Sequence, residues 1–499
     1  MKNTINKYVF RTLVAGMGFM SFSCTDYLEI EPVSTITTAG FWVNEDNANG
    51  ALQGMYVRFR DQAAYNLFIL GEARSETLSY GLQASEGRER YFENSLDPNF
   101  AGPNWLRLYT VIHDANLIIK YVPDIEFGRE QDKNRMLGEA YAMRAFLYFT
   151  MAKTWGDVPL VTSPTEGYDA ESTFRSRTAV GEIFAQVKSD IERALELLPA
   201  NDALGTDRAA WSAAAVNTLK GDVYLWTGKV LGGGSGDFQT ALDALDQVAG
   251  HAGVGLMEDY DQIFRYDQKG NREILFAVRF LDLESGTNYN SELYIRDDQI
   301  PSATSEEVRE TIGTGGGLNR WAPSPLLREA FGDADQRKDA SFVSIFLESE
   351  DDSPSHYASV VRKYRGFVDP SGRRFIDDIV IYRYAEVLLL KAEAKNALGQ
   401  DPSAEINQIR QRAYGEQYPG HAYIDAGQEA NDDAILRERM LEFAFEGKRW
   451  FDLVRFDKAF ERVPSLQGRE DERHLLLWPI SLGTISLNSK IEQNPGYGN

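Results

Sequence analysis

The sequence predicts an all-α dominated fold, built on tetratricopeptide-like helix pairs, with a loop-rich, partly β face. Three observations support this fold class. Apolar residues recur at helical spacing over several long segments, and short turns with glycine or proline join these segments in pairs. Between Gly253 and Asp378 the pattern changes to short β-like runs and polar loops. Hydrophobic residues make up 43% of the 499 residues, which is enough for a large core.

The first strong helical pattern covers residues 139–155. Apolar residues such as Met143 fall on one stripe of this segment, and Gly156 permits a left-handed C-terminal cap. A second helix is expected over residues 178–199, with Thr178 as its N-cap and a proline at its end.

Two further helix pairs follow along the chain. Residues 210–230 and 238–250 form one pair across the glycine-rich turn 231–237, and residues 381–399 and 402–414 form another. Each pair carries small Ala or Gly residues where helices can approach closely. About four such pairs can be argued, which is typical of degenerate tetratricopeptide-like repeats that bury their faces on one another.

The segment between Gly253 and Asp378 has a different character. Residues 273–280 and 342–347 read as short strands, and the loops between such runs are rich in Gly, Ser, Asn and Pro. Ordering long irregular segments is unfavourable, and those retained in a compact fold are usually functional. We therefore expect the loop-rich face to carry the function and the helices to form the scaffold.

The N-terminus predicts a signal peptide over residues 1–23. The basic residues Lys2, Lys7 and Arg11 accompany an apolar run, and a polar sequence follows Cys24. The pattern resembles a bacterial lipoprotein signal, in which Cys24 becomes the lipidated N-terminal residue. The alternative is an ordinary secretory signal with a chance cysteine. Because Cys24 is the only cysteine, no intramolecular disulfide is possible.

Composition and motifs argue against several function classes. The formal charge of −23 disfavours nucleic acid and anionic membrane surfaces as partners. The five histidines are scattered without a zinc motif, no GxSxG elbow is present, and the glycine-rich runs lack the GK[ST] of a phosphate-binding loop. The sequence predicts no catalytic residue, no metal and no cofactor.

Three acids near the C-terminus could suggest a hydrolase. Glu438, Glu442 and Glu446 recur at a spacing of four residues on one helix face. A glycosidase needs two carboxyl groups that face each other across a cleft. Because basic residues alternate with these acids, we interpret them as a salt-linked helix face.

The adjoining stretch 443–456 alternates acids, bases and large aromatics. We expect Trp450 to lie in the apolar stripe of the helix. Glu446, Arg449 and Asp452 are expected to satisfy each other's charges at a partly buried end. The stretch offers no plausible nucleophile beside a base, so we interpret it as structural.

Residues 438–456, "ERMLEFAFEGKRWFDLVRF", resemble the C-terminal signature of the SusD/RagB family, the surface lipoproteins of Bacteroidetes nutrient-uptake systems. Residues 144–161 and 219–229 and the closing "LWPIS" agree in order, so the resemblance covers essentially the whole chain. It implies a SusD-like fold with a loop-rich ligand-binding face. It also implies an N-terminal half over 24–252, co-folded with a RagB/SusD half over 253–499.

The resemblance implies a binding role and a partner. Members of the family bind oligosaccharides without cleaving them, at the cell outer membrane, together with a SusC-like TonB-dependent transporter. Two alternatives stay open from the residues: a RagB-like uptake lipoprotein that binds peptides, and a glycoside hydrolase with an unrecognised acid pair.

Aromatic residues in the loops are the candidates for the ligand platform. Sugar rings have apolar C–H faces and polar rims, so aromatic side chains flanked by amides or charges can hold them. We predict a platform formed by Trp321, Tyr289 and Tyr294, with Asn288, Asn319 and Arg320 as hydrogen-bonding neighbours, and an opposite wall formed by Tyr80, Arg88 and Tyr91. The alternative is that Trp321, which precedes a proline-rich turn, only packs that turn.

Overall fold

The computed structural model describes residues 38–84, 87–167, 173–199, 204–284, 286–348 and 353–498. The predicted signal peptide and Cys24 lie outside the described residues, so their role stays a prediction.

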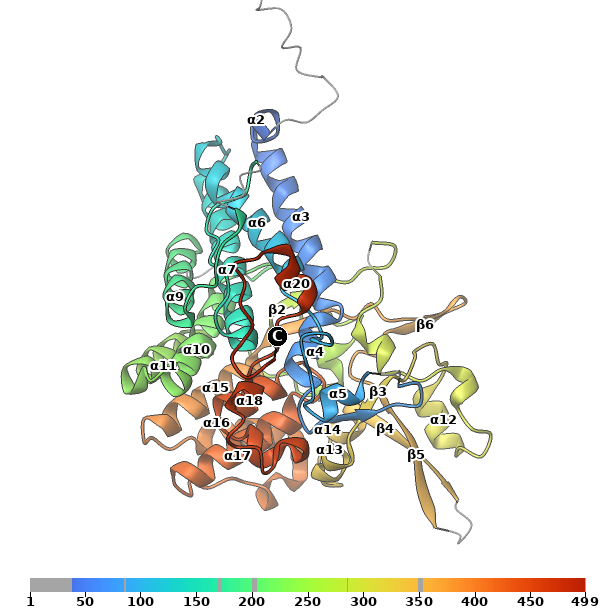
Figure 1. Ribbon diagram of the computed structural model, residues 1–499. Helices are drawn as coiled ribbons and strands as arrows, with labels where there is room; N and C mark the ends of the chain where they lie inside the picture. The colour runs from blue at the N-terminus through green and yellow to red at the C-terminus, as the bar shows by residue number, and fades with distance from the viewer. Residues whose placement is uncertain are drawn as a thin grey trace, which may run out of the picture.

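Long helices form most of the N-terminal half (Figure 1). Their apolar residues repeat at helical spacing, and the stretches between them hold Gly, Pro or polar caps. The bounds are α2 Thr38–Phe41, α3 Glu45–Ala63, α4 Asn66–Glu72, α5 Glu89–Phe92, α6 Leu106–Tyr121, α7 Glu130–Trp155, α9 Val180–Leu197, α10 Ala213–Val230 and α11 Gly234–Ala249.

The second half contains shorter helices around a strand-rich segment. Its helices are α12 Glu306–Ile312, α13 Pro325–Ala330, α14 Arg337–Ser341, α15 Tyr384–Ala397, α16 Ser403–Tyr414, α17 Gln428–Glu442, α18 Arg449–Arg455, α19 Ala459–Arg462 and α20 Leu482–Leu487. Single 3-10 turns are η1 Val122–Asp124, η2 Tyr260–Phe264, η3 Tyr289–Glu292, η4 Asp297–Gln299, η5 Gly415–Gly420, η6 Pro464–Leu466 and η7 Arg473–Leu476.

The strands pair in twos and antiparallel. β1 (Leu78–Tyr80) pairs with β3 (Trp321–Pro323), and β2 (Ile274–Val278) pairs with β8 (Ile379–Arg383). β4 (Phe342–Glu348) and β5 (Pro354–Val361) form a long hairpin, and β6 (Phe367–Asp369) pairs with β7 (Gly372–Arg374). Two of these pairs therefore join segments that lie more than a hundred residues apart in the chain.

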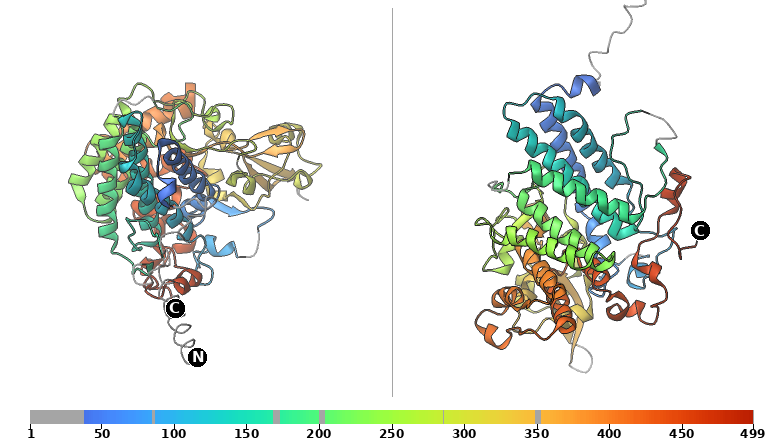
Figure 2. Two further views of the ribbon diagram at one scale, coloured as in Figure 1. Left: turned by 90° about the horizontal axis from the view of Figure 1, so that it is seen from above. Right: turned by 90° about the vertical axis from the view of Figure 1, so that its left-hand side faces the viewer.

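The helices stack in sequence order along one side, and the strands project from the other (Figures 1 and 2). α7 packs against α9, α10 against α11, and α15 against both α11 and α16. One core cluster includes buried side chains from Ala48 to Tyr497, so the helical stack and the C-terminal segment share an interior. The division of the chain at residue 252 stays a prediction.

The structure confirms the helix-dominated fold class and corrects one detail of it. The segments expected at 178–199, 210–230, 238–250, 381–399 and 402–414 are helical over most of their length. The expected N-cap Thr178 is wrong, because α9 begins after Ala179 and has no side-chain cap. The backbone N–H of Thr178 instead donates to the carbonyl oxygen of Val158 at 2.9 Å, so this residue ties the chain back to the end of α7.

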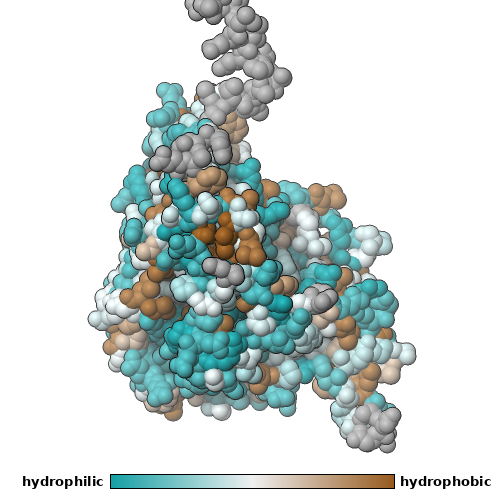
Figure 3. Space-filling view, in the orientation of Figure 1, coloured by the Kyte–Doolittle hydropathy of each residue, from teal (hydrophilic) through white to brown (hydrophobic). Residues whose placement is uncertain are grey.

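The face seen in Figure 1 is mostly hydrophilic, and its larger apolar area lies in the upper, helical part (Figure 3). Within the described ranges, no helix combines the length and the apolar character needed to span a bilayer.

Candidate functional site

The two loops predicted to form opposite walls meet at a short pair of strands. Tyr80 of β1 lies directly opposite Trp321 of β3 in the antiparallel register. The backbone N–H of Gln83 donates to the carbonyl oxygen of Asn319 at 3.0 Å and continues this pairing into the loop. The structure therefore brings the two predicted segments together.

Trp321 lies at the centre of this meeting point but is fully buried. Tyr91 and Phe92 contact its indole edge-on, with ring centroids 5.6 Å and 5.4 Å away, and the Arg88 guanidinium lies 4.5 Å from the ring centroid. The indole N–H donates to the hydroxyl of Tyr65 at 3.0 Å. An indole enclosed in this way cannot stack on a sugar, so the prediction that Trp321 is a solvent-facing platform is wrong for this structure.

Tyr289 and Tyr294 are also interior residues. Tyr289 is 3% exposed, stacks on Phe68 with centroids 4.4 Å apart, and donates its hydroxyl to the carbonyl oxygen of Phe445 at 2.7 Å. Tyr294 is fully buried and donates its hydroxyl to the carbonyl oxygen of Ile312 at 2.5 Å. Both hydroxyls are used inside the fold, so neither tyrosine offers its ring to a ligand here.

The two predicted asparagines hold the loops themselves. The side-chain oxygen of Asn288 accepts from the N–H of Asn290 at 3.0 Å, and its amide donates to the carbonyl oxygen of Asp377 at 3.0 Å. Asn319 accepts from the N–H of Leu82 at 2.8 Å and donates to the carbonyl oxygen of Ser359 at 3.0 Å. These amides satisfy buried backbone groups, and the prediction that they bind sugar hydroxyls is corrected on that ground.

Of the four remaining predicted residues, Tyr80 and Arg320 form an accessible layer, whereas Arg88 and Tyr91 are largely buried. Tyr80 is 51% exposed and leans edge-on against Phe92, with ring centroids 4.8 Å apart. The side chain of Arg320 is 38% exposed, whereas Arg88 is only 12% exposed. Tyr91 is buried beneath this layer and acts as a support.

A carboxylate that sequence reasoning missed connects the two arginines. Glu292 binds Arg320 through both carboxylate oxygens, at 2.9 Å and 3.0 Å, and it binds Arg88 at 3.3 Å. Glu292 lies on η3 in the loop already chosen for its aromatics, but an isolated glutamate gave no signal in the sequence. Tyr65, which joins Arg88 to the indole of Trp321, was missed for the same reason.

We call this set the loop-face cluster and define it by its members: Tyr65, Tyr80, Arg88, Glu292, Arg320 and Trp321. Its accessible parts are the ring of Tyr80 and the guanidinium group of Arg320, and the largely covered carboxylate of Glu292 is held between two arginines. These groups can bind hydroxyl-rich ligands through ring contacts and hydrogen bonds. The ring of Tyr80 packs on Phe92, and Arg320 and Glu292 hold each other through two hydrogen bonds, which pre-organises the cluster for binding.

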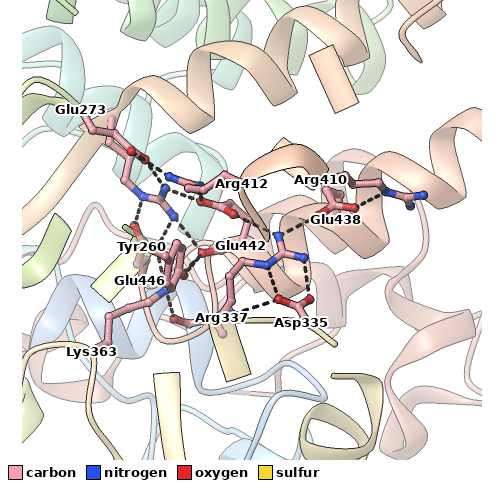
Figure 4. Close-up of polar contacts among 12 residues, drawn as sticks. Tyr260, Glu273, Asp335, Arg337, Lys363, Arg410, Arg412, Glu438, Glu442 and Glu446 are labelled. Carbon is pink, nitrogen blue, oxygen red and sulfur yellow. Dashed lines mark hydrogen bonds and ion pairs between the residues drawn. The ribbon is translucent and has the colours of Figure 1, made fainter. Parts of the chain in front are cut away.

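The C-terminal acids belong to a second, interior cluster (Figure 4). Glu442 accepts from Arg337 at 3.0 Å and from Arg383 at 2.5 Å, and it also binds Arg412. Glu438 binds Arg337 at 2.7 Å and Arg410 at 2.9 Å. The acids are salt-linked, as predicted, but their partners come from α14, β8 and α16 and not from their own helix.

The predicted mutual pairing of Glu446, Arg449 and Asp452 is wrong. The chain leaves the helical path after Glu442 and resumes at Arg449, which points these side chains in different directions. Glu446 binds Lys363 and Arg383, both at 2.8 Å, whereas Arg449 binds Glu76 at 2.5 Å. Asp452 binds two other arginines, at 2.9 Å and 3.1 Å.

The electrostatics of these acids are those of a structural network. Burial alone would raise the pKa of Glu442, but the neighbouring guanidinium groups of Arg412, Arg383 and Arg337 outweigh it and hold the pKa well below 4.5. Burial also raises the pKa of Glu446, but the charges of Arg383 and Lys363 outweigh burial, so the net pKa is lowered. A general acid needs a raised pKa, so these two carboxylates lack the property that a glycosidase acid requires.

Burial raises the pKa of five other acids, Glu72, Asp114, Asp377, Asp378 and Asp432, and the largest of these shifts are those of Glu72 and Asp377. Burial raises the pKa of Glu72 and of Asp377 to about 7. Glu72 accepts from the backbone N–H of Gly447 at 3.1 Å, and Asp377 accepts from that of Gly366 at 2.5 Å. Both are enclosed at 0% and 1% exposure, so a glycosidic oxygen cannot reach them in this structure.

Metal binding finds no support in the described part of the chain, where no group of three or more His, Cys, Asp or Glu side chains could hold an ion.

Comparisons with known proteins agree on one family. The sequence model of the SusD family matches residues 370–497, and a second model, described as starch-binding associating with outer membrane, matches residues 26–220. The solved structure titled B. fragilis NanU is 34% identical, with a TM-score of 0.82 over 94% of this chain and 100% of that chain.

Two further proteins are similar over most of their length. A SusD superfamily protein from Bacteroides vulgatus is 31% identical, with a TM-score of 0.82 over 92% of this chain and 100% of that one. SusD-like protein P38 from Formosa agariphila is 28% identical over 100% of both chains.

Proposed function

Because the chain belongs to the SusD superfamily, we propose that it captures oligosaccharides at the loop-face cluster and delivers them to a SusC-like TonB-dependent transporter in the outer membrane. The description of the matching family model as starch-binding and associated with the outer membrane supports the glycan class and the location.

One observation carries the proposed site: Tyr80 is exposed on top of an otherwise enclosed aromatic cluster. Because its ring packs on Phe92, which itself packs on Trp321, the ring of Tyr80 is fixed before a ligand arrives. Arg320, which adjoins the strand partner of Tyr80 in the chain, and Glu292, which binds Arg320, provide a donor and an acceptor for hydroxyl groups at the rim of a sugar ring. This arrangement suits binding and contains no group poised to attack a glycosidic bond.

The charges around the cluster favour a neutral ligand. Glu292 neutralises part of the charge of Arg88 and Arg320, while Arg90 binds Asp97 at 2.6 Å and Arg296 binds Asp298 at 2.5 Å. The loop arginines thus carry their own counter-charges, and the whole chain is strongly acidic. A polyanionic glycan would meet repulsion without a compensating basic groove.

The first prediction tests the site. Tyr80→Ala should weaken oligosaccharide binding by about 1–3 kcal/mol, on the scale of a lost aromatic stacking contact. Its stability should change little, because half of the side chain is already exposed. Calorimetry with a panel of neutral oligosaccharides measures the affinity, and Tyr357→Ala on β5, where the side chain is 37% exposed, is the matched control.

Unchanged affinity of the Tyr80→Ala protein would remove the loop-face cluster from the proposal. The same panel separates the alternatives. Retention of short peptides in place of glycans would favour the RagB-like role, and new reducing ends in the incubated glycans would favour a hydrolase.

The second prediction concerns the membrane anchor. Cys24→Ala should release the protein from the outer-membrane fraction, because the acyl chains of one lipidated cysteine are sufficient for stable anchoring. Fractionation followed by a salt wash measures this release, and circular dichroism checks that the fold is unchanged. A variant that stays membrane-bound after the wash would rule out the lipoprotein anchor.

A further inference from the structure

A second surface groove lies between α3 and α6, on the helical part of the molecule. It encloses about 560 Å³, within the range of small-molecule sites. In Figure 1, α3 runs from α2 at the top of the view down to α4, which lies near α5 and β3. α3 lines the groove from Gly50 to Arg58, whereas the loop-face cluster lies beyond the C-terminal end of this helix.

Two glycines of α3, Gly50 and Gly54, line this groove, and no close packing contact within the described part of the protein requires glycine at either position. Glycine is among the least favourable residues in a helix interior. Packing explains the glycines in the interiors of two other helices, α7 and α10: a Cβ on Gly138 would lie 2.7 Å from Leu198, one on Gly221 would lie 2.6 Å from Leu245, and one on Gly228 would lie 2.4 Å from Phe238. A Cβ on Gly50 or Gly54 would meet no atom within 4 Å.

The groove also contains an unpaired buried acceptor. Asp114 is 7% exposed, and one of its carboxylate oxygens binds Arg58. The other oxygen, Oδ2, is buried and has no hydrogen-bond partner among the described residues. A buried carboxylate oxygen without a partner is unfavourable, and a ligand hydroxyl could satisfy it once the Asp114 side chain turns toward the groove that it lines.

Donors lie beside this acceptor. Nδ1 of His113 accepts from the N–H of Thr165 at 3.3 Å, so the neutral ring carries its proton on Nε2 as a donor. The Arg58 side chain is 56% exposed and retains further N–H groups. Trp42 forms an aromatic wall of the groove and is fixed by stacking on Tyr121, with centroids 5.3 Å apart.

This combination selects a class of ligand. The Asp114 carboxylate would repel a free anion, and the Arg58 guanidinium would repel a cation. A neutral polyol matches both, because each hydroxyl can donate to Asp114 and accept from Arg58 or His113. The glycines let such a ring lie close to the α3 backbone. We propose that the groove between α3 and α6 is a second saccharide-binding site that takes one or two neutral sugar units.

The test uses the full-length chain and saturation-transfer NMR. The probes are the methyl glycosides of glucose, galactose, mannose, xylose and N-acetylglucosamine at millimolar concentration. The background carries Tyr80→Ala and Arg320→Ala, which disable the loop-face cluster, so that any remaining signal reports on a different site. Failure of the loop-face proposal would appear separately, as unchanged oligosaccharide affinity in this double variant.

We expect at least one glycoside to give a signal in this background. Gly54→Leu, which fills the groove, should weaken that binding by about tenfold or more, the scale of one lost stacking or hydrogen-bonded contact. Asp114→Asn should also weaken it. Gly181→Leu is the matched control, because Gly181 also has open space around it in a helix, α9, that does not line the groove.

The variants should remain folded, since leucine at position 54 meets open space and favours helix more than glycine does. An equal or higher melting temperature of Gly54→Leu verifies this. If no glycoside binds to the protein that carries Tyr80→Ala and Arg320→Ala, or if binding survives the addition of Gly54→Leu, the groove is not a saccharide site.

Discussion

Glu442→Gln should lower the free energy of unfolding by about 3–5 kcal/mol at pH 7, the scale of breaking a buried ion pair by removing one partner. The Glu442 carboxylate is fully buried and binds Arg337, Arg383 and Arg412. Glutamine keeps the shape but not the charge, so three enclosed guanidinium groups lose a shared counter-charge. Urea unfolding of the two proteins measures the difference.

The same variant should reveal a pH dependence with a definite sign. Burial raises and the arginines lower the pKa of Glu442, with a net value well below 4.5 in the folded state. The unfolded chain therefore binds this proton more readily, and the stabilisation is fully present above about pH 4.5. This stabilisation is lost as the pH falls through the folded pKa. The difference in the free energy of unfolding between the wild type and Glu442→Gln should therefore become smaller below pH 4.5.

Glu196→Gln is the control for this experiment. Glu196 is 64% exposed and pairs with Arg193 one helical turn away, so its loss should change stability by less than about 0.5 kcal/mol. A Glu442→Gln protein as stable as the wild type at pH 7 would contradict the structural interpretation of the acids. Their buried charges would then need another explanation, such as a role in ligand binding.

The helices could be predicted because the relevant signal is local. In 139–155 and 381–399 the apolar spacing lies within the segment itself, and the terminating glycine is its last residue or the next one. The partners of Glu442 could not be predicted in the same way. Arg337 and Arg383 come from α14 and β8, and only the tertiary fold places them beside α17.

At the candidate site, too, the local sequence predicted some features, and others depend on tertiary contacts. The loops were identified from their composition, and the structure does pair the strand that carries Tyr80 with the strand that begins at Trp321, next to the accessible Arg320. The burial of Trp321 was missed because its cover comes from α5, more than two hundred residues away in the chain. Asn288 was misjudged for a local reason: its side chain caps the 3-10 turn η3, a role that the sequence analysis did not consider.

Trp450→Ala should destabilise the protein by about 3–5 kcal/mol, as truncation of a large core aromatic does. Trp450 is fully buried at the start of α18. Its ring also covers the guanidinium of Arg74, which lies 4.3 Å from the centroid and is itself fully buried. Alanine would leave a cavity and remove one aromatic face from an enclosed cation, whose pKa burial already lowers.

Trp450→Phe separates these effects from a functional role. The indole N–H of Trp450 is buried without a hydrogen-bond partner among the described residues, so phenylalanine loses no hydrogen bond and retains an aromatic face for Arg74. We expect it to be clearly more stable than Trp450→Ala, and calorimetric melting compares the two. Oligosaccharide affinity should be normal in whatever fraction of each variant is folded. A Trp450→Ala protein with an unchanged melting temperature but no ligand binding would reverse the assignment, because the stretch 443–456 would then be a binding site and not the packed junction between α17 and α18.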